Sequence, residues 1–188
     1  MGMLISMAYK ENPNYCKGKV NYSNKNAVEN MIRYVTRSRP NENRFISLIS
    51  YGGLGVRCYG APEEMIAQFL HVQHVYNIDS RGGRRLYHEV FNLTDEDFRR
   101  LCLDFNQVNI LARTICNVYY QMGHQVVYAI HYEPEEHLYI HFVVNTINFR
   151  TGRKWHEYKA STACRERLFN EILRNQECII IKKIVNIC

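Results

Sequence analysis

The sequence has few prolines and no long apolar run. Only 4 of the 188 residues are proline and 10 are glycine, which excludes a collagen-like or low-complexity chain. The longest apolar stretches, such as residues 142–144 and 178–181, fall far short of the roughly 20 residues that cross a bilayer. The N-terminus has no basic segment followed by a long apolar one. We therefore expect a cytoplasmic protein with no membrane insertion.

The cysteines form no recognisable framework. There are 7 of them, an odd number, and no two are arranged as CxxC. Disulfide frameworks use even numbers of cysteines, and structural zinc sites use closely spaced pairs. Neither is expected here, and two of the thiols, which lie fourteen residues apart on an amphipathic pattern, are expected to pack as small apolar groups.

Positive charge and tyrosine are plentiful. Lys and Arg number 24 against 18 Asp and Glu, which gives a net charge of +6, and there are 14 tyrosines. A basic surface with aromatic side chains suits nucleic acid, although the same charge balance also serves solubility. The motifs have to decide between these two explanations.

Apolar periodicity predicts helices and strands in a single domain without internal repeats. Four segments have helical spacing: residues 24–37, 62–76, about 95–122 and about 161–175. Five segments have strand character: residues 45–51, 84–93, 125–131, 137–147 and 179–187. Gly52–Gly55 is expected to be a turn. This order predicts an α+β fold with an antiparallel central sheet flanked by helices, including one long helix at about residues 95–122.

The predicted hairpin of residues 125–147 gathers histidines. Alternation along a strand places His137 and His141 on one face of the sheet. His131 ends the preceding strand, where the hairpin brings it alongside His141, with Glu133 nearby. Imidazoles and a carboxylate on one sheet face suit a divalent cation. The hairpin therefore predicts a metal site, although any one of these histidines is as well explained as a strand-surface residue.

Three stretches carry a family resemblance over roughly residues 20–160. They are NMIRYVTR at residues 30–37, GRRLYHEVFNL at residues 83–93, and HYEPEEHLYIHFVVN at residues 131–145 followed by NFRTGRK. In this order they resemble the tyrosine motif, the strand before the long helix and the third motif of conjugative relaxases. These are mobilisation endonucleases of the His-hydrophobic-His (HUH) superfamily, in the branch of plasmid mobilisation proteins and the T-DNA border nuclease.

The resemblance implies an enzyme with an RRM-like palm as its central sheet. Relaxases are metal-dependent, site- and strand-specific DNA endonucleases and transesterases. They nick single-stranded DNA at the origin of transfer (oriT) of a plasmid or integrative element and form a 5′-phosphotyrosyl intermediate, which initiates conjugative mobilisation. The implied cofactor is a divalent metal ion, Mn²⁺ or Mg²⁺, without ATP. The implied partners, in a bacterial cytoplasm, are origin-of-transfer DNA, accessory mobilisation proteins and a type IV coupling protein.

The resemblance also assigns roles to residues. Tyr34 is the expected nucleophile, because it lies in the tyrosine motif among arginines, and Tyr22 is the alternative. A phenol with a pKa of about 10 is a poor nucleophile at neutral pH, so it needs a neighbouring base or cationic field. We expect residues 1–188 to form one nuclease domain, which is either complete or the N-terminal part of a longer protein.

The expected metal ligands are His131, His137 and His141, followed by Glu133. The usual pair of histidines around one hydrophobic residue is Tyr-Ile-His here, with Tyr139 in the first place. Either His137 or Glu133 then supplies the missing ligand, or the site has lost its metal and the protein only binds DNA.

Basic residues near the motifs are expected to contact DNA phosphates. The expected DNA-binding residues are Arg33, Arg37, Arg39, Arg84, Arg85, Asn145, Arg150, Arg153 and Lys154. For Asn145, a role in supporting the metal ligands or as a strand-end polar residue is the alternative. His88 and Tyr87 either face the metal site or pack in the core.

Two other functions fit the same residues. The first is a rolling-circle replication initiator or transposase of the same superfamily, which uses the same kind of site. The second is an RRM-like module that binds nucleic acid without cutting it and has no metal dependence.

Overall fold

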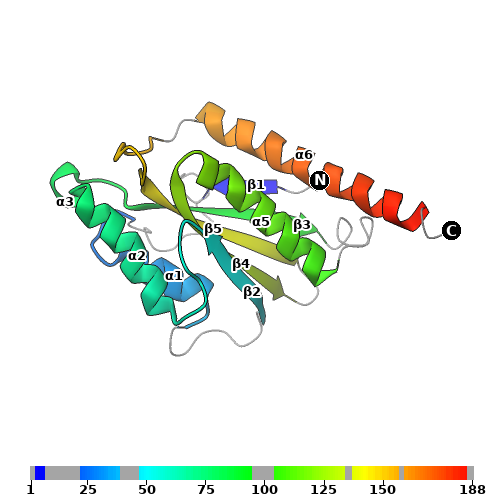
Figure 1. Cartoon of the computed structure of the whole chain (residues 1–188), viewed down its shortest axis with the longest axis horizontal. Coiled ribbons are helices and arrows are strands. Elements are labelled where there is room, and N and C mark those ends of the chain that lie inside the picture. Colours follow the sequence, from blue (N-terminus) through cyan, green and yellow to red (C-terminus); the bar gives the residue numbers. More distant parts are fainter. Residues whose placement is uncertain are drawn as a thin grey trace, which may run out of the picture.

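A five-stranded antiparallel sheet lies at the centre of the fold (Figure 1). The computed structural model describes residues 3–6, 22–38, 47–94, 104–133, 137–156 and 159–185. The strands are β1 (Met3–Ser6), β2 (Ser47–Leu54), β3 (Leu86–Thr94), β4 (His124–Glu133) and β5 (His137–Asn148), in the order β1-β3-β5-β4-β2. The helices are α1 (Ala27–Val35), α2 (Pro62–Val75), α3 (Ile78–Arg81), α5 (Phe105–Gln121) and α6 (Lys159–Val185). The predicted α+β class with an antiparallel sheet is confirmed.

Each face of the sheet has its own apolar core. On one face, α1 and α2 pack with Ile32 and Phe69 against Val127, Ala129 and Val143. On the other face, α5 and α6 cover the sheet through side chains that include Tyr119, Phe142 and Phe169. Figure 1 shows α1 and α2 on one side of the molecule and α6 on the opposite side. Each fully buried apolar side chain contributes about 1.5–3 kcal/mol.

The β4-β5 hairpin sets the register of the predicted site. His131 lies opposite Tyr139, and His141 lies opposite Ala129. On the other side of β5, strand β3 pairs antiparallel, with His88 opposite Val143. The three strands β3, β5 and β4 are neighbours, so histidines from all of them share one face.

The long central helix begins later than the periodicity predicts. Asp104 has an extended backbone (φ −103°, ψ 172°) and its carboxylate accepts a hydrogen bond from the N–H of Gln107, whose side chain accepts from the N–H of Asp104. Such a capping box fixes a helix N-terminus. The predicted continuous helix at about 95–122 is therefore wrong at its start, because α5 begins at Phe105. Residues 95–103 lie outside the described residues.

The C-terminal helix replaces an expected strand. Helix α6 runs over 27 residues from Lys159 to Val185, so the expected end of the helix at about residue 175 and the strand at 179–187 are wrong. Residues 159–185 contain no proline or glycine, so no residue of this segment would end the helix at about residue 175. Residues 186–188 lie outside the described residues.

Two further differences concern strands. Strand β2 continues through Gly52 and Gly53 to Leu54, where a turn was expected. A Cβ atom at Gly52 would lie 2.7 Å from the hydroxyl oxygen of Tyr128, so glycine here makes room for a neighbouring ring rather than for a turn. The turn itself lies at Gly55, which has a φ of +71°. The short strand β1, at the edge beside β3, was not predicted.

None of the described helices has the length and apolar character needed to span a membrane.

Candidate active site

Three imidazoles meet on the face of the sheet that α1 covers. His88 of β3, His131 of β4 and His141 of β5 form this group, called the histidine cluster below. The ring centroids of His131 and His141 are 4.4 Å apart, and those of His88 and His141 are 5.2 Å apart in a stacked arrangement. All three side chains are buried.

Burial keeps the histidine cluster neutral. Burial, with a smaller effect of the charge of His131, lowers the pKa of His88 from 6.5 to about 4. Burial lowers the pKa of His131 to about 4 as well, with a further contribution from Arg37, although the Val35 carbonyl acts in the opposite direction. The pKa of His141 lies well below its ordinary value, again chiefly because of burial. At neutral pH the imidazoles are uncharged, which is the form that binds metals and accepts protons.

The contacts of His131 define its tautomer. Its Nε2 atom lies 2.7 Å from the carbonyl oxygen of Val35, and a carbonyl only accepts, so Nε2 carries the proton. Its Nδ1 atom lies 3.3 Å from Nη2 of Arg37, a group that only donates. The lone pair of His131 is therefore on Nδ1 and points toward Arg37.

His88 orients His141. Nε2 of His88 lies 2.9 Å from Nδ1 of His141, and Nδ1 of His88 lies 3.2 Å from the hydroxyl oxygen of Tyr22. If His141 donates to His88 and His88 donates to Tyr22, the Nε2 atom of His141 carries its lone pair. Metal-binding histidines commonly donate their second N–H to such a partner. His131, through Val35, has the same kind of support.

Tyr34 faces the histidine cluster from the last turn of α1. Its ring centroid lies 6.0 Å from that of His141 and 6.3 Å from that of His88, edge to face in both pairs. The side chain is partly exposed, whereas the alternative nucleophile Tyr22 is buried. A nucleophile has to reach its substrate, so these exposures favour Tyr34.

Arg37 lies against both Tyr34 and the histidine cluster. The carbon at the centre of its guanidinium is 5.3 Å from the centroid of the Tyr34 ring, and its Nη2 reaches His131. Its backbone has a φ of +53°, a left-handed conformation that is costly for a residue with a side chain. Here this conformation ends α1 and turns the chain so that Arg37 returns toward Tyr34. Such strain is typical of functional sites.

The donor set fits a cation in part. In the part of the chain that the structure describes, no three His, Cys, Asp or Glu side chains together have the arrangement of a metal site. Two imidazoles, those of His131 and His141, do have the supporting hydrogen bonds of metal ligands. Imidazoles suit Zn²⁺ and other transition metals, whereas Mn²⁺ and Mg²⁺ favour oxygen ligands, which would have to complete the shell.

The other predicted ligands lie further along the same strands. Glu133 is partly exposed at the end of β4, two residues beyond His131 and on the same face, and its backbone pairs with His137. The side chain of His137 lies outside the described residues. Tyr139 is partly exposed opposite His131, and its ring centroid is 6.5 Å from that of His141. The structure thus brings two of the predicted ligands, His131 and His141, together. It also places His88 beside them as a third histidine.

His88 is the residue whose role the sequence left open. Its position opposite Val143 follows from the pairing of β3 with β5, and its partner His141 is 53 residues away in the chain. The Tyr87-His88 pair in a predicted strand was the available signal, and it did not decide which of the two side chains faces the site. The structure turns Tyr87 to the opposite face, where it packs against Trp155.

Asn145 lies in a buried amide network rather than at the surface. It is fully buried, and its Nδ2 donates to the carbonyl of Phe69 and to Oε1 of Gln125. Its Oδ1 accepts from Nε2 of Gln73 at 3.1 Å. These bonds fasten α2 to the sheet, and a side chain held this way does not face DNA.

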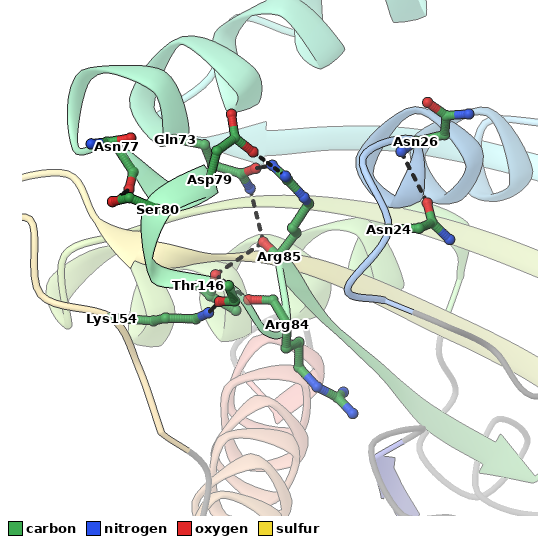
Figure 2. Close-up of polar contacts among 11 residues, drawn as sticks. Asn24, Asn26, Gln73, Asn77, Asp79, Ser80, Arg84, Arg85, Thr146 and Lys154 are labelled. Atoms are coloured by element: carbon green, nitrogen blue, oxygen red, sulfur yellow. Dashed lines mark hydrogen bonds and ion pairs between the residues drawn. The ribbon is translucent and has the colours of Figure 1, made fainter.

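Basic residues gather where β3 begins and β5 ends. Figure 2 shows Arg85 directed toward Asp79. Lys154 donates a hydrogen bond to the carbonyl of Gly82. Partial burial, followed by the charges of Arg85 and Arg81, lowers the pKa of Lys154. The contributions of Arg85 and Arg81 reflect closely spaced positive charge, which attracts anions.

The remaining predicted basic residues have different surroundings. Arg84 lies between two rings, at 5.2 Å from that of Tyr22 and 5.0 Å from that of Tyr87. Arg33 pairs with Glu29 and Glu63 at 3.0 and 2.7 Å. Arg150 and Arg153 are exposed in and beside the turn after β5, whereas Arg39 lies outside the described residues.

The match to known families starts at the tyrosine. Residues 34–178, more than half of the chain, match the family described as "Relaxase: MobA/VirD2-like, nuclease domain". This range begins at Tyr34 and contains the whole histidine cluster. No curated protein and no solved structure matches the chain.

Proposed function

Because the chain belongs to the MobA/VirD2-like relaxase nuclease domain family, whose activity is DNA nicking, we propose that it cuts single-stranded DNA at an origin of transfer. The product is a 5′-phosphotyrosyl link on Tyr34. The observation that carries the proposal is the meeting of Tyr34, from α1, with His88 of β3, His141 of β5 and Arg37. A phenol, neutral imidazoles that can hold a metal ion and a positively charged side chain suit this reaction.

The chemistry exchanges one ester bond for another. The oxygen of Tyr34 attacks phosphorus, a bond from this oxygen to the 5′ phosphate forms, and the bond to the 3′ oxygen breaks. The strand leaves with a free 3′-OH. Because the phosphodiester becomes a phosphotyrosine, the bond is conserved for later rejoining and no ATP is needed. The charge of Arg37 favours both the phenolate form of Tyr34 and the phosphate, and the proton that the phenol loses is balanced overall by the one that the 3′ oxygen gains.

His131 and His141 are the residues that would hold a divalent ion, through Nδ1 and Nε2 respectively. Relaxases of this family generally use such an ion, and Mn²⁺ or Mg²⁺ is our expectation. Glu133 and His137 are the candidates for further ligands. A bound ion supplies positive charge to the phosphate oxygens as negative charge develops on them.

The basic residues at the sheet end are the proposed path of the DNA backbone. Arg84, Arg85 and Lys154 lie where β3 begins, and Arg150 and Arg153 lie at the adjacent turn. Single-stranded DNA is held by such cations together with aromatic rings. In a bacterial cytoplasm, accessory mobilisation proteins and a type IV coupling protein complete the proposed set of partners.

The test is covalent capture of DNA. Labelled single-stranded oligonucleotides that span candidate origins of transfer are incubated with the protein and Mn²⁺, or with EDTA, and resolved on a denaturing protein gel. We expect an adduct that needs Mn²⁺ and is absent in Tyr34→Phe. The adduct should fall at least about a hundredfold in His141→Ala, because removing a positioned catalytic group typically costs that much.

Tyr22→Phe is the comparison variant, since it removes a hydroxyl from the same region but not the proposed nucleophile. It removes one hydrogen bond of His88, so it should reduce the adduct by no more than about tenfold and should not abolish it. An adduct that persists in Tyr34→Phe but is lost in Tyr22→Phe would move the nucleophile to Tyr22. Binding that survives EDTA, with no adduct on oligonucleotides that cover an entire mobilisable element, would favour a module that binds without cutting.

A further inference from the structure

Arg37 and a metal ion need the same lone pair. Nε2 of His131 is protonated, because it lies 2.7 Å from the Val35 carbonyl oxygen. Nδ1 is then the nitrogen of His131 that can bind a cation, and it already accepts a hydrogen bond from Arg37 at 3.3 Å. One lone pair serves one partner at a time.

The position of Arg37 is built into the end of α1. The N–H of Arg37 donates to the Tyr34 carbonyl and the N–H of Ser38 donates to the Arg33 carbonyl, which closes the helix around a left-handed Arg37. The Val35 carbonyl that fixes the tautomer of His131 belongs to the same turn. This short segment therefore sets both the orientation of His131 and the group that its lone pair meets.

We propose that Arg37 is a latch on the metal site: in the metal-free protein its guanidinium occupies Nδ1 of His131, and it must move before that nitrogen binds a cation. The positive charge of a guanidinium also repels a divalent ion. The displaced side chain stays beside Tyr34, where the scissile phosphate arrives. The inference depends on the proposed function only in treating the histidine cluster as the metal site.

The latch makes a counter-intuitive prediction for metal affinity. Removing a residue from an active site usually weakens ligand binding, but Arg37→Met should bind Mn²⁺ more tightly than the wild-type protein. A hydrogen bond to a charged group is worth enough for an increase of about tenfold. The measurement is isothermal titration of the protein with Mn²⁺ alone, with no DNA present.

Arg33→Met is the matched control. Arg33 lies in the last turn of α1, four residues before Arg37, and has the same kind of side chain, but it pairs with Glu29 and Glu63 and does not contact His131. Its substitution should change Mn²⁺ affinity by less than about threefold, as expected for a screened surface charge. Equal changes in the two variants, or an affinity in Arg37→Met no higher than in the wild type, would overturn the latch.

A second measurement needs neither metal nor activity. In the metal-free protein, ¹⁵N spectra of histidine side chains report which ring nitrogen is protonated and whether the other accepts a hydrogen bond. His131 should be protonated at Nε2 in both the wild type and Arg37→Met. The ¹⁵N chemical shift of its Nδ1 should differ between these two proteins, because only the wild type has the hydrogen bond from Arg37. An unchanged Nδ1 signal would refute the latch even if the protein nicks DNA. A shifted signal in a protein that forms no DNA adduct would support the latch and leave the proposed function as the part that failed.

Discussion

The central sheet buries a polar cluster on each face, and the two clusters are paired in different ways. On the face covered by α5 and α6, the carboxylate of Glu89 accepts hydrogen bonds from Tyr119 and from two nitrogens of Arg165. On the opposite face, the preceding residue, His88, contacts His141 and Tyr22. Two consecutive residues of β3 thus begin two clusters with different chemistry.

The two clusters differ in their charge and in the hydrogen-bond partners of their acceptor atoms. Glu89 is matched by the charge of Arg165, whose guanidinium also lies 4.9 Å from the centroid of the Trp155 ring. Burial, followed by the charge of Glu89, raises the pKa of Tyr119 well above its ordinary value, so that it stays a donor. This cluster links β3, α5 and α6 through buried hydrogen bonds. The histidine cluster combines uncharged bases with Arg37, which suits a reacting anion instead.

The largest expected effect is a loss of stability when the cluster around Glu89 is disrupted. Glu89→Ala leaves the buried Arg165 without its counter-charge, and we expect the free energy of unfolding to fall by about 3–5 kcal/mol. Urea denaturation followed by circular dichroism measures this change. The double variant Glu89→Leu with Arg165→Met should recover most of the stability, because apolar groups of similar volume can replace a buried ion pair.

A cost below about 1 kcal/mol for Glu89→Ala would contradict this description. It would mean that the ion pair is no more than a surface-type contact, and that the two clusters do not differ as described.

The second expected effect is a pH dependence of stability that comes from the histidine cluster on one face of the sheet. His88 and His131 have pKa values of about 4 in the folded protein, below the ordinary value of about 6.5 in an unfolded chain. Their contribution to stability is complete above about pH 6.5 and is lost as the pH falls toward 4. Each group then contributes a slope of up to about 1.4 kcal/mol per pH unit.

The measurement compares unfolding of the metal-free protein at several values between pH 7 and pH 4.5. Carboxylates elsewhere also respond to acid, so the comparison is made with His131→Asn, which should have a shallower slope than the wild type. Parallel slopes in the two proteins would show that His131 is not held in its neutral form by the fold.

The local part of the site could be predicted from the sequence. Alternation along β5 placed His141 on the face of the site, and the hairpin placed His131 beside it, which the register and the ring contact confirm. A hairpin has few registers, because a slip by one residue would turn every side chain to the other face. Short-range pairing of this kind is encoded in the pattern itself.

The long-range part could not be predicted in the same way. His88 joins the cluster because β3 lies beside β5, and no local pattern states which strands become neighbours. The continuous helix α6 was missed because an apolar run such as residues 178–181 fits a strand or a buried helix equally well. Gly52 was assigned to a turn because the close ring of Tyr128 comes from a strand distant in sequence.

The smallest expected effect concerns the exposed arginines. Arg153→Met should weaken binding of a fluorescent single-stranded oligonucleotide by about twofold to fivefold, and should reduce the salt dependence of binding by about 0.7 in the logarithmic slope. Arg167→Met, an equally exposed change on α6, is the control on the Glu89 side. Fluorescence anisotropy at several salt concentrations measures both. Equal losses would mean that DNA is attracted to net charge rather than to one side of the molecule.

The order of the strands also determines how the site responds to thermal motion. Strands β3, β5 and β4 each have a neighbour on both sides, and the edges of the sheet are β1 and β2. Edge strands open first, whereas interior strands exchange their amide hydrogens only when most of the domain unfolds. The backbone amides of His88, His131 and His141 should be among the slowest to exchange. The histidine cluster is therefore held on a rigid base, and Tyr34 and Arg37 face it from outside the sheet.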